Sequence, residues 1–503
     1  MGRFLLICSG GALGTGARFL VSGWAALAVG SAFPRATLLV NVTGSFVIAL
    51  VMELSLVTGA VSQDARLFLT TGLMGGYTTY SSFNHETLAL AGRGAWDLAL
   101  LYVALTVVGA LAAGFLGLFA ARAIASAGTR IDDPERDARR RAIRQVVLAA
   151  IGTRALVAAC LWAGTFFPRE NRGFDRIAAD GHRYMFAPWR LLDALARWDS
   201  AFYLRLAGQG YVAPASGAPY DAAFFPLYPA IVRGAAWLTG LPLVAAGALV
   251  SLACFALAVR AVFLLLEEVA GPGRAGAATV ALLVFPASLF LTAVYPESLF
   301  LLLSATAIRA ARRGGFALAG LAAALAALTR PNGALVLVPV AIEAAAALRR
   351  RERLLPDALA LALPCAAVLL HMAELRQAFG DPLAFIHVQA QWSRGLAPPW
   401  AALLAFNFDP EYYVVALGAL AAIAWAVRRQ PASLQAHAAL AILVPLCTGT
   451  MKSLPRFAGV AFPLFLTVSD WTAGRRRRAA YLAVALALLA VYAFRFARGD
   501  AIN

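Results

Sequence analysis

The stretch TRIDDPERDARRRAIRQ, residues 129–145, separates two long hydrophobic blocks and decides how the chain is organised. Six of its residues are arginines, and an apolar run, residues 146–166, follows directly. Arginine-rich loops next to membrane helices face the cytoplasm. We therefore predict two membrane domains, residues 1–125 and 146–503, joined by a basic cytoplasmic linker over residues 126–145.

The composition is that of a membrane protein. Of 503 residues, 61% are hydrophobic and 14% are charged, with a mean hydropathy of +0.74. A soluble domain has about 25% charged residues. Apolar runs of roughly 17–25 residues recur along the chain, as expected for helices that cross a bilayer. The net charge of +17 comes mainly from arginines in short loops. We expect an all-α polytopic protein of the cell's inner (plasma) membrane, with no nucleic-acid partner.

The first block contains four apolar segments with polar groups inside them. The segments are residues 4–29, 36–57, 66–91 and 95–121. In the third, Gly75 and Gly76 are followed by a run of hydroxyl residues that starts at Thr78. This pattern predicts a helix broken in mid-membrane, whose freed carbonyls can hold a cation. It is equally typical of a tight helix crossing through small residues.

Three motifs of this block resemble the Fluc/CrcB family of fluoride channels. They are GGALGTGARF (residues 10–19), LLVNVTGSF (38–46) and GLMGGYTTYSSFNHE (72–86), in family order. The resemblance implies a dimer of antiparallel subunits with two fluoride pathways. It also implies a structural Na⁺ held by the backbone carbonyls of Gly75 and Thr78.

The resemblance places the fluoride pathway on particular side chains. Asn41 would offer amide N–H donors to the anion. Tyr80 and Phe83 fall on the family's pair of pore phenylalanines, whose ring edges carry partial positive charge. Tyr80 departs from the usual phenylalanine by one hydroxyl group. Arg18 is expected either to attract anions at the vestibule or to pair with Glu86. Further hydroxyl residues complete the predicted track: Ser81, Ser82 and Thr106.

Arginine runs give the second block a clear orientation. They lie at residues 139–144, 309–313, 349–353, 428–429 and 475–478. If these runs face the cytoplasm, about 11 transmembrane helices fit between and around them. The predicted helices are residues 146–166, 243–266, 276–294, 297–311, 315–329, 331–348, 357–373, 412–427, 434–450, 457–470 and 479–495.

This orientation puts six polar motifs on the external side, where we expect one composite site. Asp199 is a candidate general base for a hydroxyl nucleophile, although the same pattern is typical of a helix N-cap. Trp392 would stack on a sugar or belong to an interfacial aromatic belt. The motifs are RWDSAFYLRLAGQGY (197–211), AAFFPLYP (222–229), VYPES (294–298), TRPNG (329–333), HVQAQWSRG (387–395) and KSLPRF (452–457).

These motifs resemble the membrane glycosyltransferases of the GT-C class, most closely the PIG-V-like mannosyltransferases. The resemblance implies a polyprenyl-phosphate-linked sugar donor and an inverting transfer on the external face, with Asp199 as the base. Arg197, Arg330 and Arg456 would bind the donor phosphate, or else serve as headgroup anchors or ion-pair partners. Glu297 would orient the acceptor hydroxyl or cap the next helix. No DxD pattern with further ligands is present, so we predict no catalytic metal.

The whole chain is thus interpreted as a fluoride channel fused to a glycosyltransferase. Two alternatives remain at this point: an enzyme whose first four helices are a non-conducting dimerising anchor, and a channel attached to an inert scaffold. The linker raises a further question, because it fixes one orientation while the channel family pairs antiparallel. We therefore expect an oppositely inserted partner, either a separate channel subunit or an inverted copy of this chain.

Overall fold

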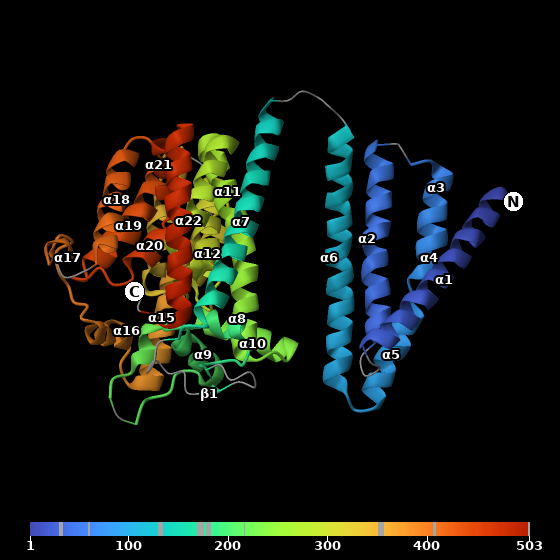
Figure 1. Ribbon diagram of the computed structural model, residues 1–503, viewed down its shortest axis with the longest axis horizontal. Helices are drawn as coiled ribbons and strands as arrows, with labels where there is room; N and C mark the ends of the chain where they lie inside the picture. The colour runs from blue at the N-terminus through green and yellow to red at the C-terminus, as the bar shows by residue number, and fades with distance from the viewer. Residues whose placement is uncertain are drawn as a thin grey trace. The chain divides into compact units, whose positions relative to one another are not determined.

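A computed structural model describes residues 1–29, 34–58, 61–128, 134–168, 176–177, 183–215, 217–350, 357–405 and 409–500. It separates into two compact units, Met1–Asp133 and Pro134–Asn503 (Figure 1). This division falls inside the predicted linker. Residues 134–145 are nevertheless helical, because they form the first turns of α7 (Pro134–Gly164), with proline at a favourable first position.

The all-α polytopic class is confirmed. Among the described residues, eight helices are long and apolar enough to cross a membrane, three in the first unit and five in the second. Three shorter apolar helices of the second unit, α13, α18 and α19, fall below the ~20 residues of a full span. Helices of spanning length in the described part of the second unit are therefore fewer than the eleven we predicted.

The first unit has the four predicted segments, and the third is broken. Three helices are continuous: α1 (Gly2–Val29), α2 (Arg35–Thr58) and α6 (Trp96–Gly128). The third segment begins as α3 (Gln63–Leu67), η1 (Phe68–Met74, a π-helix) and α4 (Gly75–Tyr77). Thr78 and Thr79 then adopt extended backbone angles before α5 (Tyr80–Gly92) begins. The predicted helix break is thus confirmed.

Glycines let α1 cross this broken segment at very close range. A Cβ atom on Gly14 would lie 1.9 Å from the carbonyl oxygen of Leu73. One on Gly76 would lie 2.4 Å from the carbonyl oxygen of Gly11. Neither position can take a larger residue without moving backbone. The break and the small-residue crossing, which the sequence offered as alternatives, therefore occur together.

The second unit is a helical bundle with one short hairpin. The strands β1 (Arg176–Ile177) and β2 (Arg183–Tyr184) pair antiparallel. Up to the middle of the unit, the helices after α7 are α8 (Arg190–Ala194), α9 (Ser200–Gln209), η2 (Tyr220–Ala223), α10 (Leu227–Thr239), α11 (Leu243–Val284), η3 (Pro286–Leu291), α12 (Glu297–Arg312), α13 (Phe316–Ala327) and η4 (Pro331–Val336). They continue with α14 (Leu337–Arg349), η5 (Asp357–Ala362), α15 (Leu363–Phe379), α16 (Ala384–His387), η6 (Val388–Trp392), α17 (Ala401–Leu404), α18 (Pro410–Ala426), α19 (Ala432–Leu446), α20 (Leu454–Val460), α21 (Leu464–Trp471) and α22 (Arg475–Arg498).

Prolines explain where helix boundaries differ from the prediction. The predicted helix 276–294 ends at Val284, because Pro286 starts the 3₁₀ element η3. Its first half instead continues α11 beyond a kink at Gly271, where φ is 77° and Pro272 follows. The predicted helix 457–470 is two short helices, α20 and α21, with Pro463 at the N-cap of the second.

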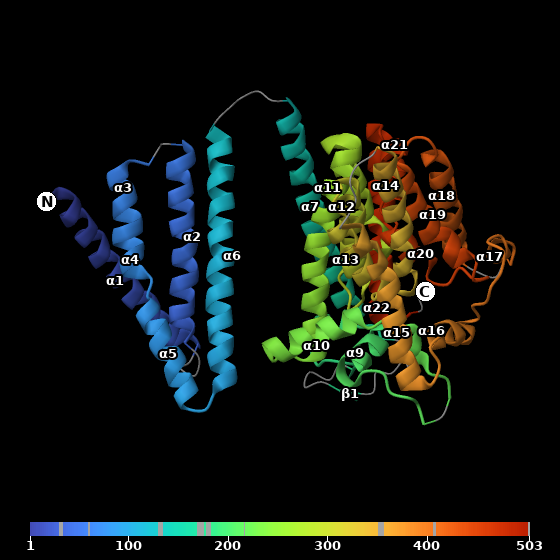
Figure 2. The same cartoon turned by 180° about the vertical axis from the view of Figure 1, so that it is seen from behind.

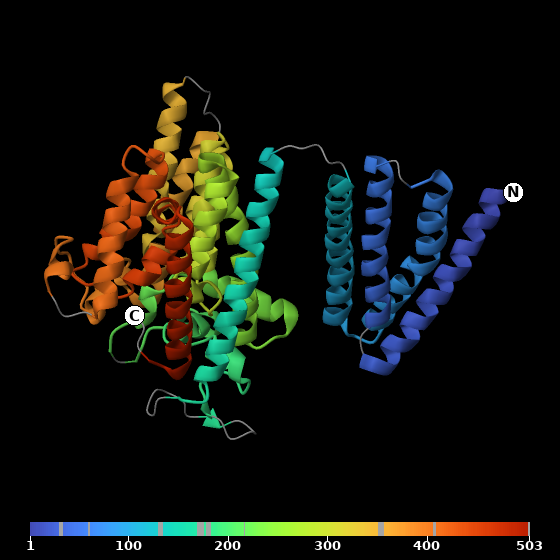
Figure 3. The same ribbon diagram turned by 45° about the horizontal axis from the view of Figure 1, so that its top comes forward.

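Close packing of α7 against α22 supports one side of the second unit (Figure 3). A Cβ atom on Gly164 would lie 2.6 Å from the carbonyl oxygen of Phe494. The short helices α9 and α10 lie together at one end of this unit in both opposite views (Figures 1 and 2). The first polar motif, residues 197–211, includes the turn before α9 and α9 itself, so this end of the bundle positions the site described below.

Arg154 of α7 fixes the turn after α11. Its Nη1 donates to the carbonyl of Ser288 at 2.6 Å, and its Nη2 donates to the hydroxyl of Ser288 at 2.9 Å. An arginine inside a membrane helix is costly unless such partners are present. The contact anchors η3, and η3 carries Phe290 into the wall of the cavity.

Candidate functional site

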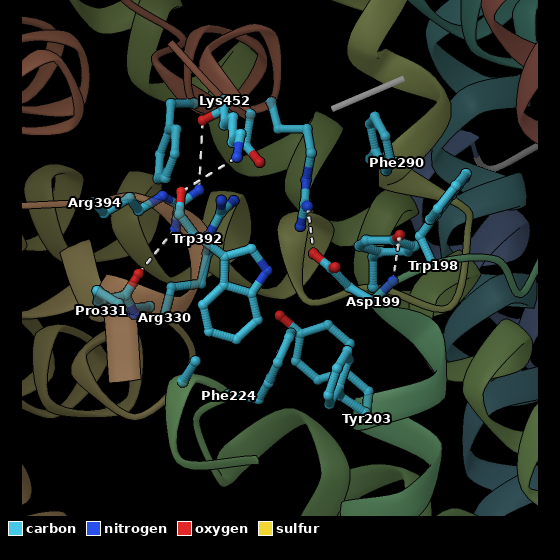
Figure 4. Close-up of a pocket in the computed structure, with 17 residues that line it drawn as sticks. Trp198, Asp199, Tyr203, Phe224, Phe290, Arg330, Pro331, Trp392, Arg394 and Lys452 are labelled. Atoms are coloured by element: carbon cyan, nitrogen blue, oxygen red, sulfur yellow. Dashed lines mark hydrogen bonds and ion pairs between the residues drawn. The ribbon is translucent and has the colours of Figure 1, made fainter. Parts of the chain in front are cut away.

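A cavity of about 400 Å³ lies in the second unit, and all six polar motifs contribute to its wall (Figure 4). The six motifs therefore come together around one cavity, as predicted. Aromatic rings, among them Tyr203, Phe224 and Trp392, supply much of the apolar surface. Apolar walls with a few charged groups are typical of a small-molecule site. The charged lining residues are Asp199, Arg330, Arg394, Lys452 and Arg456.

Asp199 occupies the N-cap position of α9, but its side chain makes no capping hydrogen bond. Its backbone N–H donates to Tyr295 Oη at 3.1 Å, which holds the turn in place. Its Oδ2 accepts a 2.6 Å hydrogen bond from Arg456 Nη1. The side chain is 32% exposed, so an oxygen remains open to the cavity. The geometry favours the general-base interpretation over the capping one.

Arg456 joins two carboxylates. Its Nε and Nη2 lie 2.8 and 2.7 Å from Glu297 Oε1, while its Nη1 binds Asp199. Arg330 Nη1 lies 3.3 Å from the same Glu297 oxygen. The predicted phosphate ligands Arg330 and Arg456 do line the cavity, yet both already have a carboxylate partner.

Glu297 does not reach the cavity. Its side chain is 1% exposed at the start of α12, where it pairs with the two arginines. An orienting contact with an acceptor hydroxyl would need an exposed carboxylate oxygen. The structure therefore makes Glu297 a positioning residue that holds Arg456, and corrects the expectation that it touches the substrate.

Arg197 also lies outside the cavity. It is 2% exposed, pairs with Asp193 at 2.9 Å and donates to the carbonyl of Ala497 at 3.2 Å. Trp198 has a φ of 56°, and this left-handed turn separates the direction of Arg197 from that of Asp199. A phosphate-binding role for Arg197 is therefore not supported, and the residue anchors the loop instead.

Arg394 and Lys452 line the cavity and were not among the predicted site residues. Arg394 Nη1 donates to Gln389 Oε1 at 3.0 Å, and Lys452 Nζ donates to the carbonyl of Trp392 at 3.3 Å. Burial and the nearby charge of Arg456 lower the pKa of Arg394. Both cations belong to motifs that the sequence already singled out, but nothing in the sequence shows that they converge.

Among residues other than glycine, left-handed backbone is concentrated in the loops that form this cavity. In the described part of the chain, four residues other than glycine have φ above zero. Three of them, Trp198, Ser393 and Ser453, lie in these loops, next to Asp199, Arg394 and Lys452 respectively. Residues in this region cost free energy and cluster at functional sites. The left-handed backbone and the charged side chains therefore both indicate this cavity as the functional site.

In the first unit, Asn41 is bound to the helix break. Its Nδ2 donates to the carbonyl of Thr79 at 3.1 Å, and its Oδ1 accepts from the N–H of Thr79 at 2.9 Å. In a continuous helix that N–H would bond to the carbonyl of Gly75. Asn41 therefore leaves the Gly75 carbonyl without its helical donor, as a backbone cation site would require.

The other predicted pathway residues lie around this break. Tyr80 is 78% exposed, and its ring centre is 5.8 Å from that of Phe83. Thr79 Oγ1 lies 3.2 Å from Ser81 Oγ and 3.1 Å from Ser82 Oγ. Thr106 is 6% exposed, and its hydroxyl has no hydrogen-bond partner among the described residues.

Arg18 contacts the break rather than Glu86. Its Nη1 lies 3.5 Å from the carbonyl oxygen of Thr78, a long hydrogen bond. Glu86 instead accepts from Thr37 at 2.9 Å and from Tyr102 at 2.7 Å. We predicted that Arg18 would either attract anions at the vestibule or pair with Glu86. The contacts of the described residues do not include a pair between Arg18 and Glu86.

Comparisons with known proteins agree with this division. A family model described as CrcB-like protein, Camphor Resistance (CrcB), matches residues 5–118, and one described as Mannosyltransferase (PIG-V) matches residues 183–466. The fluoride-specific ion channel FluC of Anaeromyxobacter dehalogenans is 56% identical over 125 residues, which are 25% of this chain and 99% of that protein. The FluC channel of Sorangium cellulosum is 46% identical over 122 residues, which are 24% of this chain and 96% of that protein. The FluC channel of one Thermus thermophilus strain is 47% identical over 115 residues, which are 23% of this chain and 90% of that protein.

Proposed function

Since the chain belongs to the CrcB-like family over residues 5–118 and to the PIG-V mannosyltransferase family over residues 183–466, we propose that it combines two activities. The first unit is a fluoride-specific ion channel. The second transfers a sugar, mannose in view of the family, from a polyprenyl-phosphate donor. The enzymatic proposal is supported by the position of the Asp199 carboxylate. It faces a cavity whose other charged lining groups are all cations.

Asp199 acts as the general base in this proposal. Arg456 binds its Oδ2, which leaves Oδ1 to accept the proton of an acceptor hydroxyl. The hydroxyl oxygen then bonds to the anomeric carbon while the bond from that carbon to the phosphate oxygen breaks. The electron pair leaves with the phosphate, and this single displacement inverts the anomeric centre. The cations of the cavity stabilise the charge that develops on the phosphate.

The orientation follows from the arginine runs. The loops at residues 309–313, 428–429 and 475–478 face the cytoplasm under the positive-inside rule. The cavity motifs then face the external side of the plasma membrane. This placement suits a lipid-linked donor, because its phosphate would lie near the membrane surface while its polyprenyl chain stays in the bilayer.

Fluoride follows Asn41 and the aromatic pair in the channel unit. A strongly hydrated anion needs N–H donors and positive ring edges in place of its water, and Asn41, Tyr80 and Phe83 supply both. The hydroxyl of Thr106, which lacks a described partner, is a further donor on α6. The carbonyls of Gly75 and Thr78 would hold a structural Na⁺ that stabilises the break, in a dimer with an oppositely inserted channel subunit.

We expect Asn41→Asp to reduce fluoride efflux from liposomes by about a hundredfold or more. Aspartate keeps the oxygen that accepts from Thr79. It replaces the NH2 group, which donates one N–H to the carbonyl of Thr79 and would offer the other to fluoride, with a negative charge. Repulsion between unit charges at ~4 Å is about 4 kcal/mol at an effective dielectric constant of 20, enough for such a loss. A fluoride electrode outside loaded liposomes measures the rate.

The matched control is Asn84→Asp, the same substitution at an exposed position of α5. Its efflux should stay within about twofold of the unchanged protein. Equal efflux from both variants would show that Asn41 is not in the fluoride pathway. If the unchanged protein gives no efflux while it still transfers sugar, the first unit is a non-conducting anchor.

A further inference from the structure

We propose that Arg394 and Lys452 form the seat for the phosphate of the lipid-linked donor, while Arg456 serves to position the base. The two cations come from separate loops, and hydrogen bonds join these loops. The Gly395 N–H donates to the carbonyl of Thr448 at 3.1 Å, and Arg394 Nη2 lies 3.5 Å from the carbonyl oxygen of Lys452. These contacts hold both cations at one part of the cavity wall. The inference rests on the proposed glycosyltransferase function.

The distribution of carboxylates distinguishes the four cations that line the cavity. Arg456 is bound to Asp199 and Glu297, and Arg330 lies against Glu297. In the part of the chain that the structure describes, Arg394 and Lys452 contact only amide and carbonyl oxygens. An incoming anion can pair with these two without removing an existing partner. Moving Arg456 to a phosphate would instead leave buried Glu297 less well compensated.

The charge balance suits a phosphate leaving group. Four cations against the carboxylates of Asp199 and Glu297 leave two positive charges, and these belong to Arg394 and Lys452. The donor phosphodiester carries one negative charge. Once the bond to the anomeric carbon breaks, the released phosphate monoester carries up to two. The seat therefore binds the product-like charge more strongly than the donor, which lowers the barrier to transfer.

The rest of the cavity places the sugar between the seat and the base. In the view of Figure 4, Arg394 and Lys452 lie above the Trp392 ring, and Asp199 lies to its right. The ring makes an edge contact with Tyr220 at 5.5 Å between centres, which fixes its orientation. A sugar linked to a phosphate at the seat would then lie along Trp392, with its anomeric carbon toward Asp199.

Binding of farnesyl phosphate and of farnesol to the purified full-length protein tests the seat, since the two probes differ only in the phosphate. We expect Arg394→Gln and Lys452→Gln each to weaken farnesyl phosphate binding by roughly tenfold to a hundredfold, because a charge-assisted hydrogen bond is lost. Farnesol binding should not change. Lys452→Arg and Arg394→Lys, which keep the charge, should retain most of the affinity and show that the fold is intact.

Arg205→Gln is the matched control, because Arg205 pairs with Asp221 and does not line the cavity. It should bind both probes like the unchanged protein. Unaltered farnesyl phosphate binding in Arg394→Gln and Lys452→Gln would overturn the seat. Binding of inorganic phosphate is measured as well. If the two variants lose only this binding and keep farnesyl phosphate binding, the seat is overturned, because the site would then belong to a soluble phosphate. Intact binding without any sugar transfer by the unchanged protein would contradict the proposed function but leave the seat standing.

Discussion

Replacing Asp199 with asparagine is expected to lower the rate of sugar transfer by roughly 10²–10⁴-fold, the usual contribution of a general base. Asparagine has nearly the same shape and can still accept a hydrogen bond from Arg456, but it cannot take up the acceptor's proton. Asp199 makes no capping hydrogen bond, and Arg456 keeps its ion pair with Glu297, so thermal stability should change little. Turnover is measured with a labelled polyprenyl-phosphate mannose and membranes that contain the full chain.

Asp381→Asn is the control for this substitution. Asp381 is also an aspartate in a loop, with 38% of its side chain exposed, and it contacts His387 at 2.7 Å. It lies outside the cavity, so its variant should transfer sugar at the normal rate. If Asp199→Asn keeps the normal turnover, Asp199 is not the base. If it mainly lowers the melting temperature, Asp199 has a structural role.

Glu297→Gln is expected to destabilise the second unit by about 3–5 kcal/mol, because removing one partner leaves buried charges uncompensated. Glu297 is 1% exposed and holds both Arg456 and Arg330. The substitution should also reduce transfer, since a neutral amide would hold Arg456 toward Asp199 less strongly than the carboxylate does. The free energy of unfolding is measured by titration with SDS in mixed micelles.

Glu268→Gln offers a matched comparison. Glu268 is likewise shared by two arginines, with Arg309 Nη2 at 2.7 Å and Arg313 Nε at 3.0 Å, but its side chain is 26% exposed. Water screens such a pair, so its loss should cost no more than about 1 kcal/mol. Equal destabilisation by the two substitutions would mean that burial of Glu297 does not determine its contribution.

The sequence predicted where the site lies but not the role of each residue within it. The positive-inside pattern brought six motifs to one side, and all six line one cavity. Arg197 was misassigned because the direction of its side chain depends on the left-handed turn at Trp198, which no residue pattern signals. Glu297 was taken for a substrate contact because burial on the first turn of α12 depends on how neighbouring helices pack.

Arg394 and Lys452 show a second limit of prediction from sequence. Their importance comes from the absence of a described carboxylate partner, which depends on contacts between segments 58 to 257 residues apart in the sequence. Local features were easier to predict from the sequence. Two glycines followed by hydroxyl residues correctly predicted the break before Tyr80. Helix ends were missed where a proline, such as Pro286 or Pro463, interrupts an otherwise apolar run.

We propose that one chain carries two separate activities, and paired assays on one liposome preparation can distinguish them. Fluoride efflux and sugar transfer are measured together for the unchanged protein, Asn41→Asp and Asp199→Asn. We predict that the unchanged protein performs both, that Asn41→Asp loses only efflux, and that Asp199→Asn loses only transfer. Absence of either activity from well-folded unchanged protein, or loss of both in one variant, would show that the chain does not carry two separate activities.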